Sequence, residues 1–155
     1  MKILFVWPNK DIFGIKPLGL SLLSALAKEL GWQTRLFDTT KFDFGYADYT
    51  TAGEEAKMFK PVDMAGYGHK KEKHDLHSEF TKTMREFNPD CLAITSLSDE
   101  YPIAAKLAGI AKKVFPGIPV ILGGKFPTLS PDKALSINAV DFICVGEGLE
   151  AFPEF

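Results

Sequence analysis

The sequence has few of the residues that build metal sites and surfaces for polyanions. Its 155 residues include two cysteines and three histidines, and its formal net charge is only -2. Neither Cys91 nor Cys144 has a close cysteine or histidine neighbour, which argues against a metal knuckle, and we expect both to be buried, reduced thiols. The small net charge provides no basic field to attract nucleic acid or an anionic membrane.

A long hydrophobic run is also missing. The first apolar run, residues 2–7, ends at Pro8 and is too short for a signal peptide or a membrane span. We therefore expect a cytoplasmic protein without a membrane span. The hydrophobic share of 46% and the charged share of 25% are typical of a globular protein, and the length fits one domain, residues 1–155.

Short apolar runs alternate with helical patterns along most of the chain. The apolar runs predict strands at 2–7, 33–37, 90–95, 118–122 and 140–145. The helical spacing predicts helices at 17–30, 74–87, 103–115 and 131–135, and a terminal one that begins at Leu149. Right-handed crossovers then predict an α/β fold of the flavodoxin-like, Rossmann type, with a five-stranded parallel sheet in the order 2-1-3-4-5 and helices on both faces.

Residues 39–73 interrupt this alternation. They contain aromatic residues and several glycines but no sustained period, and the segment is long for a plain connection. We expect an irregular insertion with some local structure.

The loops that follow the third, fourth and fifth predicted strands are rich in glycine and hydroxyl residues. They contain Ser96, Leu97 and Ser98, then Gly123, Gly124, Lys125, Phe126, Pro127 and Thr128, then Gly146, Glu147 and Gly148. Ligands of open parallel sheets bind outside the carboxyl ends of the strands, and glycine there lets a ligand approach the backbone. We therefore expect a ligand site at this edge, where Gly124→Val should weaken binding without unfolding the domain.

The motifs of several common ligands are absent. Gly14 and Gly19 have the wrong spacing for the dinucleotide motif G-x-G-x-x-G, and no G-K-[ST] sequence indicates a P-loop. The first loop lacks the hydroxyl residues that hold a flavin phosphate and the acids of a phospho-acceptor pocket. His69, His74 and His77 lie close together, but their lysine-rich segment favours a solvated surface over a metal site.

Three motifs resemble the amino-terminal cobalamin-binding domain of cobalamin-dependent radical S-adenosylmethionine enzymes. They are P-L-G-L at 17–20, G-G-x-x-P-T at 123–128, and V-G-E-G followed by E-A-F-P-E-F at 145–155. Their order and approximate spacing match that family over nearly the whole chain. The sequence departs from the family at Phe126, where histidine is frequent, and at Leu149, where an acid is frequent.

The resemblance implies that cobalamin lies over the carboxyl ends of the strands, with its nucleotide tail descending between them. The implied contacts are Pro17, Leu18 and Gly19 together with the three loops named above. Classical cobalamin methyltransferases and mutases carry D-x-H-x-x-G after the first strand, but no histidine precedes His69 here. We therefore expect base-off cobalamin without a histidine ligand.

The resemblance also implies a [4Fe-4S] cluster and S-adenosylmethionine in the parent enzyme, held by a C-terminal radical barrel. Two distant cysteines cannot form its C-x-x-x-C-x-x-C motif, so we expect this chain to bind cofactor and not to catalyse by itself. The parent would be a methyltransferase or an anaerobic ring-forming enzyme similar to the Mg-protoporphyrin monomethyl ester cyclase.

Two other functions remain open from the sequence. The departures at Phe126 and Leu149 are compatible with a docking module of the same fold that binds no cofactor, and a small flavin- or nucleotide-binding protein is the second alternative. Some expected site residues also have simpler structural roles. Ser96, Ser98 and Asp99 fit a cap of the third predicted helix, and Glu147 fits a helix start that complements the helix dipole.

Overall fold

The computed structural model of the chain describes residues 1–10, 17–44, 53, 55–58, 60, 64–67 and 74–154. Most of the predicted insertion at 39–73, including His69, lies outside these residues, as do Gly14 and Phe155. Within the insertion the structure describes a short 3-10 turn, η1 (Met64–Tyr67).

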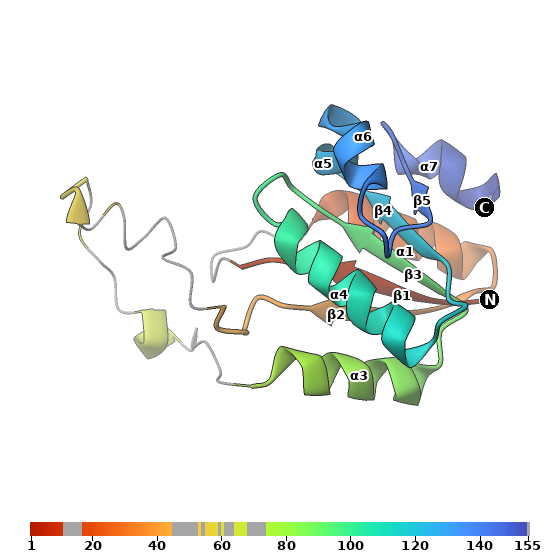
Figure 1. The fold of residues 1–155 in the computed structure, drawn as a ribbon, viewed down its shortest axis with the longest axis horizontal. Coiled ribbons are helices and arrows are strands. Elements are labelled where there is room, and N and C mark those ends of the chain that lie inside the picture. Colours follow the sequence, from red (N-terminus) through yellow and green to blue (C-terminus); the bar gives the residue numbers. More distant parts are fainter. Residues whose placement is uncertain are drawn as a thin grey trace.

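The sheet has the predicted topology. Its five strands run in the order β2-β1-β3-β4-β5, and every neighbouring pair is parallel (Figure 1). Their bounds are β1 (Lys2–Trp7), β2 (Gln33–Asp38), β3 (Cys91–Thr95), β4 (Val120–Gly123) and β5 (Phe142–Ile143). The flavodoxin-like α/β fold expected from the alternating pattern is therefore confirmed.

The fifth strand is much shorter than the predicted run at 140–145. Asp141 marks its start, because the Asp141 carboxylate accepts hydrogen bonds from Val120 N–H at 2.8 Å and from Lys112 Nζ at 2.5 Å. Burial raises the pKa of Asp141, but the bonds from Lys112 and Val120 outweigh that effect and lower the pKa below its usual 3.8. The side chain of Asp141 thus adds to the backbone bond that Asp141 N–H donates to the Val120 carbonyl at 3.0 Å, where the edge strand begins.

Helices cover both faces of the sheet, as expected. Their bounds are α1 (Leu18–Glu29), α3 (Leu76–Phe87), α4 (Tyr101–Val114), α5 (Lys125–Leu129), α6 (Pro131–Leu135), α7 (Gly148–Ala151) and the 3-10 turn η2 (Phe152–Glu154). Helix α3 starts two residues later than predicted because Asp75 caps it, accepting from the N–H groups of His77 and Ser78. Helix α5 was not predicted, since residues 123–128 were expected to be a loop.

Strand β1 is continuously apolar because both of its faces are buried. Leu4 and Val6 pack into the core under α3 and α4, whereas Ile3, Phe5 and Trp7 pack into a second core with α1 and Phe152. Successive side chains of a strand point to opposite faces, so a strand with both faces covered has no polar positions (Figure 1).

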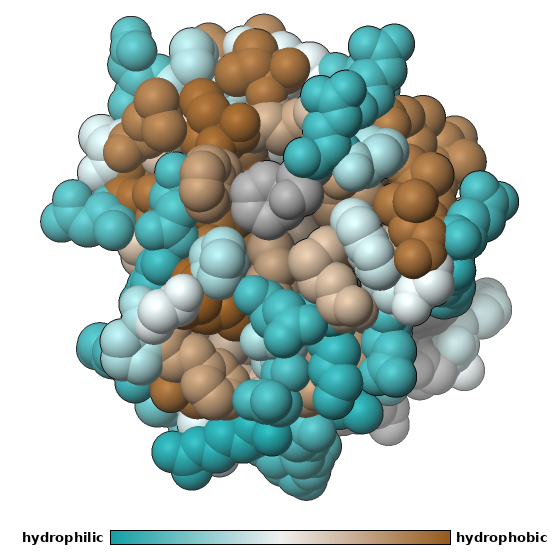
Figure 2. Space-filling model, turned by 90° about the vertical axis from the view of Figure 1, so that its right-hand side faces the viewer, coloured by the Kyte–Doolittle hydropathy of each residue, from teal (hydrophilic) through white to brown (hydrophobic). Residues whose placement is uncertain are grey.

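Both ends of the described chain lie at the same side of the molecule in Figure 1, where the strands begin. Figure 2 shows this side, on which hydrophobic and hydrophilic side chains are intermixed. Met1, Leu30 and Phe142, which precede or begin strands, are each more than 40% exposed, at 43%, 43% and 49%. Among the described helices, none has the length and hydrophobicity to cross a bilayer.

The two cysteines differ more than expected. Both are free, but only Cys91 is fully buried, whereas Cys144 is half-buried. Burial raises the pKa of the Cys91 thiol from 9.0 to about 12, and the carboxylates of Asp141 and Asp90 add to the effect. The expectation of two buried thiols is therefore wrong for Cys144, because β5 lies at an edge of the sheet.

The raised pKa of Cys91 predicts a loss of stability at high pH. The unfolded chain releases this thiol proton above pH 9 and the folded chain only near pH 12. The free energy of unfolding should therefore be unaffected by this group below pH 9 and should fall by about 1.4 kcal/mol per pH unit above it. Urea unfolding of the wild type and of Cys91→Val between pH 8 and about 11 measures the difference; equal slopes in both proteins would contradict the prediction.

Candidate functional site

The loops after β3 and β4 are joined through the backbone of Ser96. Ser96 N–H donates to the carbonyl of Gly123 at 2.9 Å, and Phe126 N–H donates to the carbonyl of Ser96 at 3.0 Å. Ser96 is 1% exposed, and its hydroxyl donates to the carbonyl of Leu97 at 2.9 Å. Ser96 therefore serves as the junction between two strand ends.

Gly124 makes this junction possible. Its φ is 96°, and a Cβ at this position would lie 2.9 Å from the Ser96 nitrogen, the Ser96 oxygen and Thr95 Oγ1. The expectation that Gly124→Val would leave the fold intact is therefore wrong, because the space beside Gly124 is filled by the backbone of the neighbouring loop. A Cβ at Gly123 would lie at an ordinary distance, 3.7 Å from the Cβ of Cys144.

The hydroxyl of Thr128 attaches the third loop to the other two. Thr128 Oγ1 donates to the carbonyl of Gly124 at 2.9 Å and accepts from Gly146 N–H at 3.0 Å. We call these three joined loops, residues 95–99, 123–128 and 144–148, the loop shelf. The sequence placed these loops at one edge of the sheet, and the hydrogen bonds show that they form one continuous surface.

The side chains of α5 are divided between this surface and the core. Lys125 and Thr128 are exposed, but Phe126 and Pro127 are buried. The Phe126 ring stacks on Tyr101 at 5.0 Å between centroids, and Lys133 Nζ lies 4.4 Å from the centre of the Tyr101 ring. Of these residues, Phe126 can contribute only its backbone to a surface ligand.

The middle of α1 packs against the end of the third loop. A Cβ at Gly148 would lie 3.5 Å from the methyl carbons of Leu23, so α7 begins against α1. Pro17 is the N-cap residue of α1, Leu18 is 73% exposed, and a Cβ at Gly19 would meet no atom within 4 Å. Glu147 is exposed at the start of α7, and its side chain makes no capping hydrogen bond.

An ion pair and a buried carboxylate hold the loop after β3, and neither was predicted from the sequence. Lys10 Nζ, after β1, lies 3.0 Å from Asp99 Oδ2. Glu100 is 5% exposed and is the N-cap residue of α4, but its carboxylate makes no capping bond and accepts instead from Leu97 N–H at 3.1 Å. Helix α4 therefore begins after Glu100, whereas a cap by Ser96, Ser98 or Asp99 would have started it earlier. The sequence signal was Pro102, because proline favours the first turn of a helix.

Five exposed apolar side chains lie in the loop shelf, next to it in the chain, or at the start of α1. We call them the apolar rim; its members are 42% to 73% exposed and are Leu18, Leu97, Leu129, Val145 and Leu149. Leu18 and Leu97 are among the site residues expected from the sequence, and Leu149 is a departure from the family pattern. Leu129, the last residue of α5, and Val145 were not expected at the site. Among the described residues, no three histidine, cysteine or acidic side chains are grouped to hold a metal ion.

Together the parallel sheet and the joined loops at the carboxyl ends of its strands define an open α/β domain, a class in which ligands bind at this edge. The chain belongs to the B12 binding domain family, whose sequence pattern it matches over residues 13–155. No curated protein sequence matches it.

The fold is also similar to that of a solved enzyme, the radical S-adenosylmethionine methyltransferase TsrM from Kitasatospora setae. The structure of that enzyme with tryptophan substrate and a SAM analogue bound matches 99% of this chain with a TM-score of 0.62 and 16% identity. A second structure, with cobalamin and a [4Fe-4S] cluster bound, matches 84% of this chain with a TM-score of 0.49 and 16% identity. This chain spans 24% and 19% of the two enzyme chains.

The close contact at Gly124 predicts a steric cost that Gly146 does not share. Both glycines have positive φ, at 96° and 86°, but a Cβ at Gly146 would meet no atom within 4 Å. Gly146→Ala should cost about 1–2 kcal/mol from backbone strain alone, and Gly124→Ala should cost about 1–3 kcal/mol more because it overpacks. Urea unfolding followed by circular dichroism measures both; equal losses would show that Ser96 can move aside.

The Thr128 hydroxyl predicts a local effect on the third loop. Thr128→Val removes both hydrogen bonds with little change in shape, so it should cost about 1–2 kcal/mol and speed hydrogen exchange at Gly146 N–H. Thr128→Ser keeps the hydroxyl and is the matched control. Slow exchange at Gly146 in the valine variant would mean that the third loop is held by other contacts.

Proposed function

We propose that this chain binds cobalamin on the loop shelf. The observation that carries the proposal is the joining of three strand-end loops into one surface in a chain of the B12 binding domain family. The contacts we propose are Pro17, Leu18, Gly19, Ser96, Leu97, Ser98, Gly123, Gly124, Lys125, Phe126, Pro127, Thr128, Gly146, Glu147 and Gly148. Those with buried side chains would act through their backbone.

The chemistry of this edge fits a corrinoid. A corrin ring has broad apolar faces and a border of amide groups. The exposed leucines and valine of the apolar rim suit the faces, and the backbone and hydroxyl groups of the loop shelf can hydrogen-bond the amides. A Cβ at Gly19 or at Gly146 would meet no atom within 4 Å, so a wide planar group can approach the backbone at both.

We further propose that this chain holds cobalamin base-off and without a histidine ligand. The three histidines are His69, His74 and His77, and none follows β1, β3, β4 or β5 directly. Bound cobalamin would supply a cobalt centre able to carry a methyl group. The residues of the chain would bind the ring, orient it and accommodate its tail between the strands.

The parent protein we propose is a radical S-adenosylmethionine enzyme, either a methyltransferase or an anaerobic enzyme similar to Mg-protoporphyrin monomethyl ester cyclase. Support comes from the fold likeness to about a quarter of the TsrM chain. Cys91 and Cys144 cannot hold a [4Fe-4S] cluster, so the cluster and S-adenosylmethionine would bind in a C-terminal barrel. The apolar rim is the surface that such a barrel would cover.

Titration of the purified chain with hydroxocobalamin tests the binding and its mode. After removal of free ligand, the visible spectrum should show retained corrinoid in the base-off state. A base-on or histidine-ligated spectrum would contradict the proposed mode. Absence of corrinoid from both the chain and its full-length parent would favour a docking module, and a flavin spectrum in purified material would favour the third function.

A pair of glycine substitutions tests the place of binding. Gly19 and Gly109 both lie in helices, α1 and α4, and a Cβ at either would meet no atom within 4 Å. Leucine is a better helix former than glycine, so neither Gly19→Leu nor Gly109→Leu should unfold the domain. Only Gly19→Leu should weaken cobalamin binding, by about tenfold or more, because it would add a branched side chain at the proposed contact. Equal affinities of the two variants would count against this site.

A further inference from the structure

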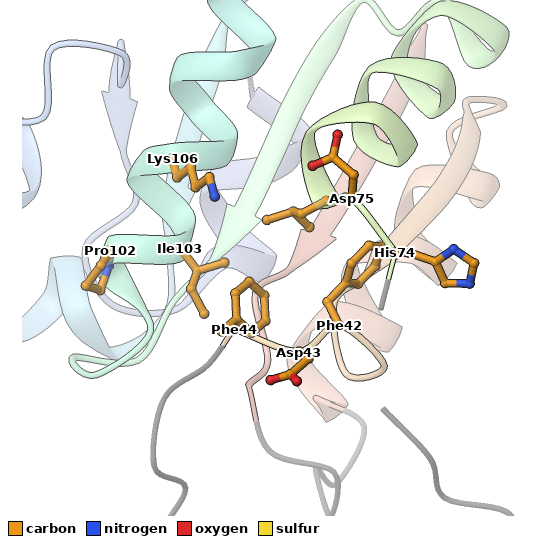
Figure 3. A pocket seen from close by; sticks show the side chains of 9 residues that line it. Phe42, Asp43, Phe44, His74, Asp75, Pro102, Ile103 and Lys106 are labelled. Carbon is orange, nitrogen blue, oxygen red and sulfur yellow. The ribbon is translucent and has the colours of Figure 1, made fainter. Parts of the chain in front are cut away.

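A second pocket lies on the β2 side of the sheet, outside the loop shelf. Its volume is about 240 Å³, which equals that of roughly eight molecules of liquid water and suits a small organic molecule. The segment after β2, the residues at the start of α3 and the first two turns of α4 form its walls (Figure 3). The lining residues that matter below are Phe42, Phe44, Asp75, Leu76, Ile103 and Lys106.

One part of this pocket is apolar and firmly held. Leu76 and Ile103 are 6% and 3% exposed and belong to the main core. The Phe42 ring lies 5.8 Å from that of Phe37, which in turn lies 4.8 Å from that of Phe80 in α3. The apolar walls are therefore preformed, as in pockets that accept an apolar side chain or ring.

The other part carries the Lys106 ammonium group and the carboxylates of Asp75 and Asp43. Lys106 extends from α4 toward the pocket, and Asp75 stands at the start of α3 on the neighbouring wall (Figure 3). Lys106 forms no ion pair with any residue that the structure describes. The Asp75 oxygens accept from His77 N–H at 3.3 Å and Ser78 N–H at 3.0 Å, which leaves lone pairs for a further donor.

Asp43 and His74 also line the pocket. Figure 3 shows the His74 ring and the Asp43 carboxylate pointing away from Lys106. The pocket is thus lined by both cationic and anionic side chains, together with aromatic and aliphatic ones. A simple anion would meet the Asp75 carboxylate, and a simple cation would meet the Lys106 ammonium. A zwitterion with an apolar group satisfies both charges.

We propose that this pocket binds a free α-amino acid with an apolar side chain. The ligand carboxylate pairs with Lys106, the ligand ammonium donates to Asp75, and the side chain lies against Phe42, Phe44 and Ile103. This function is separate from cobalamin binding, because none of these residues belongs to the loop shelf.

Amide chemical shifts of the labelled chain test the proposal, with L-phenylalanine as the probe. Saturable shifts are expected at Phe42, Phe44, Leu76 and Ile103. Two analogues each lack one charge: 3-phenylpropionate has no ammonium, and phenethylamine has no carboxylate. Each should bind about tenfold more weakly than L-phenylalanine, since each loses one charge-assisted hydrogen bond.

Substitutions at the two charged residues provide the second arm of the test. Lys106→Gln and Asp75→Asn should each weaken L-phenylalanine binding about tenfold, and asparagine retains the cap of α3. Lys113→Gln, at an exposed lysine of the same helix, is the control and should bind as the wild type does.

Absence of saturable shifts would overturn the proposal, as would equal binding of the three probes or unchanged binding by both charged-residue variants. Cobalamin retention by Lys106→Gln should equal that of the wild type, so the two proposed sites succeed or fail independently.

Discussion

The candidate site depends on the close approach of two backbones, at Gly124 and Ser96. Two hydrogen bonds join the loops there, from Ser96 to Gly123 and from Phe126 to Ser96, and they form only because Gly124 has no side chain. Thr128 then extends the contact to Gly146. If the first contact opened, α5 would lose its position and the third loop its anchor. The missing side chain at Gly124 therefore serves the packing of the two loops before it serves a ligand.

The sheet supplies the rigidity that this contact needs. Both faces of β1 are buried, by α3 and α4 on one side and by α1 and Phe152 on the other, so the strand ends cannot shift easily. The stack of Phe126 on Tyr101 ties α5 to α4, and the Lys10–Asp99 ion pair ties the end of β1 to the loop after β3. Membership of the B12 binding domain family is consistent with this construction, because a wide cofactor requires several loops to keep one relative position.

The two proposed sites occupy different parts of the same edge and have different chemistry. The loop shelf offers backbone groups, hydroxyls and an apolar rim, whereas the pocket beside β2 offers a charge pair next to aromatic rings. Asp75 is the N-cap residue of α3 and Lys106 lies in the second turn of α4, so both are attached to helices. A flat amphipathic cofactor and a small zwitterion would therefore not compete for the same groups.

The sequence by itself determined the strands, the main helices, the parallel order and the loops that meet at the carboxyl edge, because apolar periodicity and crossover handedness are local or nearly local rules. Its motifs also indicated the family that the match over residues 13–155 established. Only the tertiary structure decided that β5 is short, that residues 125–129 are helical, that Glu100 is the N-cap residue of α4 and that Phe126 is buried. Three of these involve a partner distant in the chain: Lys112 for Asp141, Ser96 for Gly124, and Tyr101 for Phe126. The Glu100 carboxylate has a nearby partner, Leu97 N–H, but meets it only in the folded turn. Such contacts arise from packing and leave no period in the sequence.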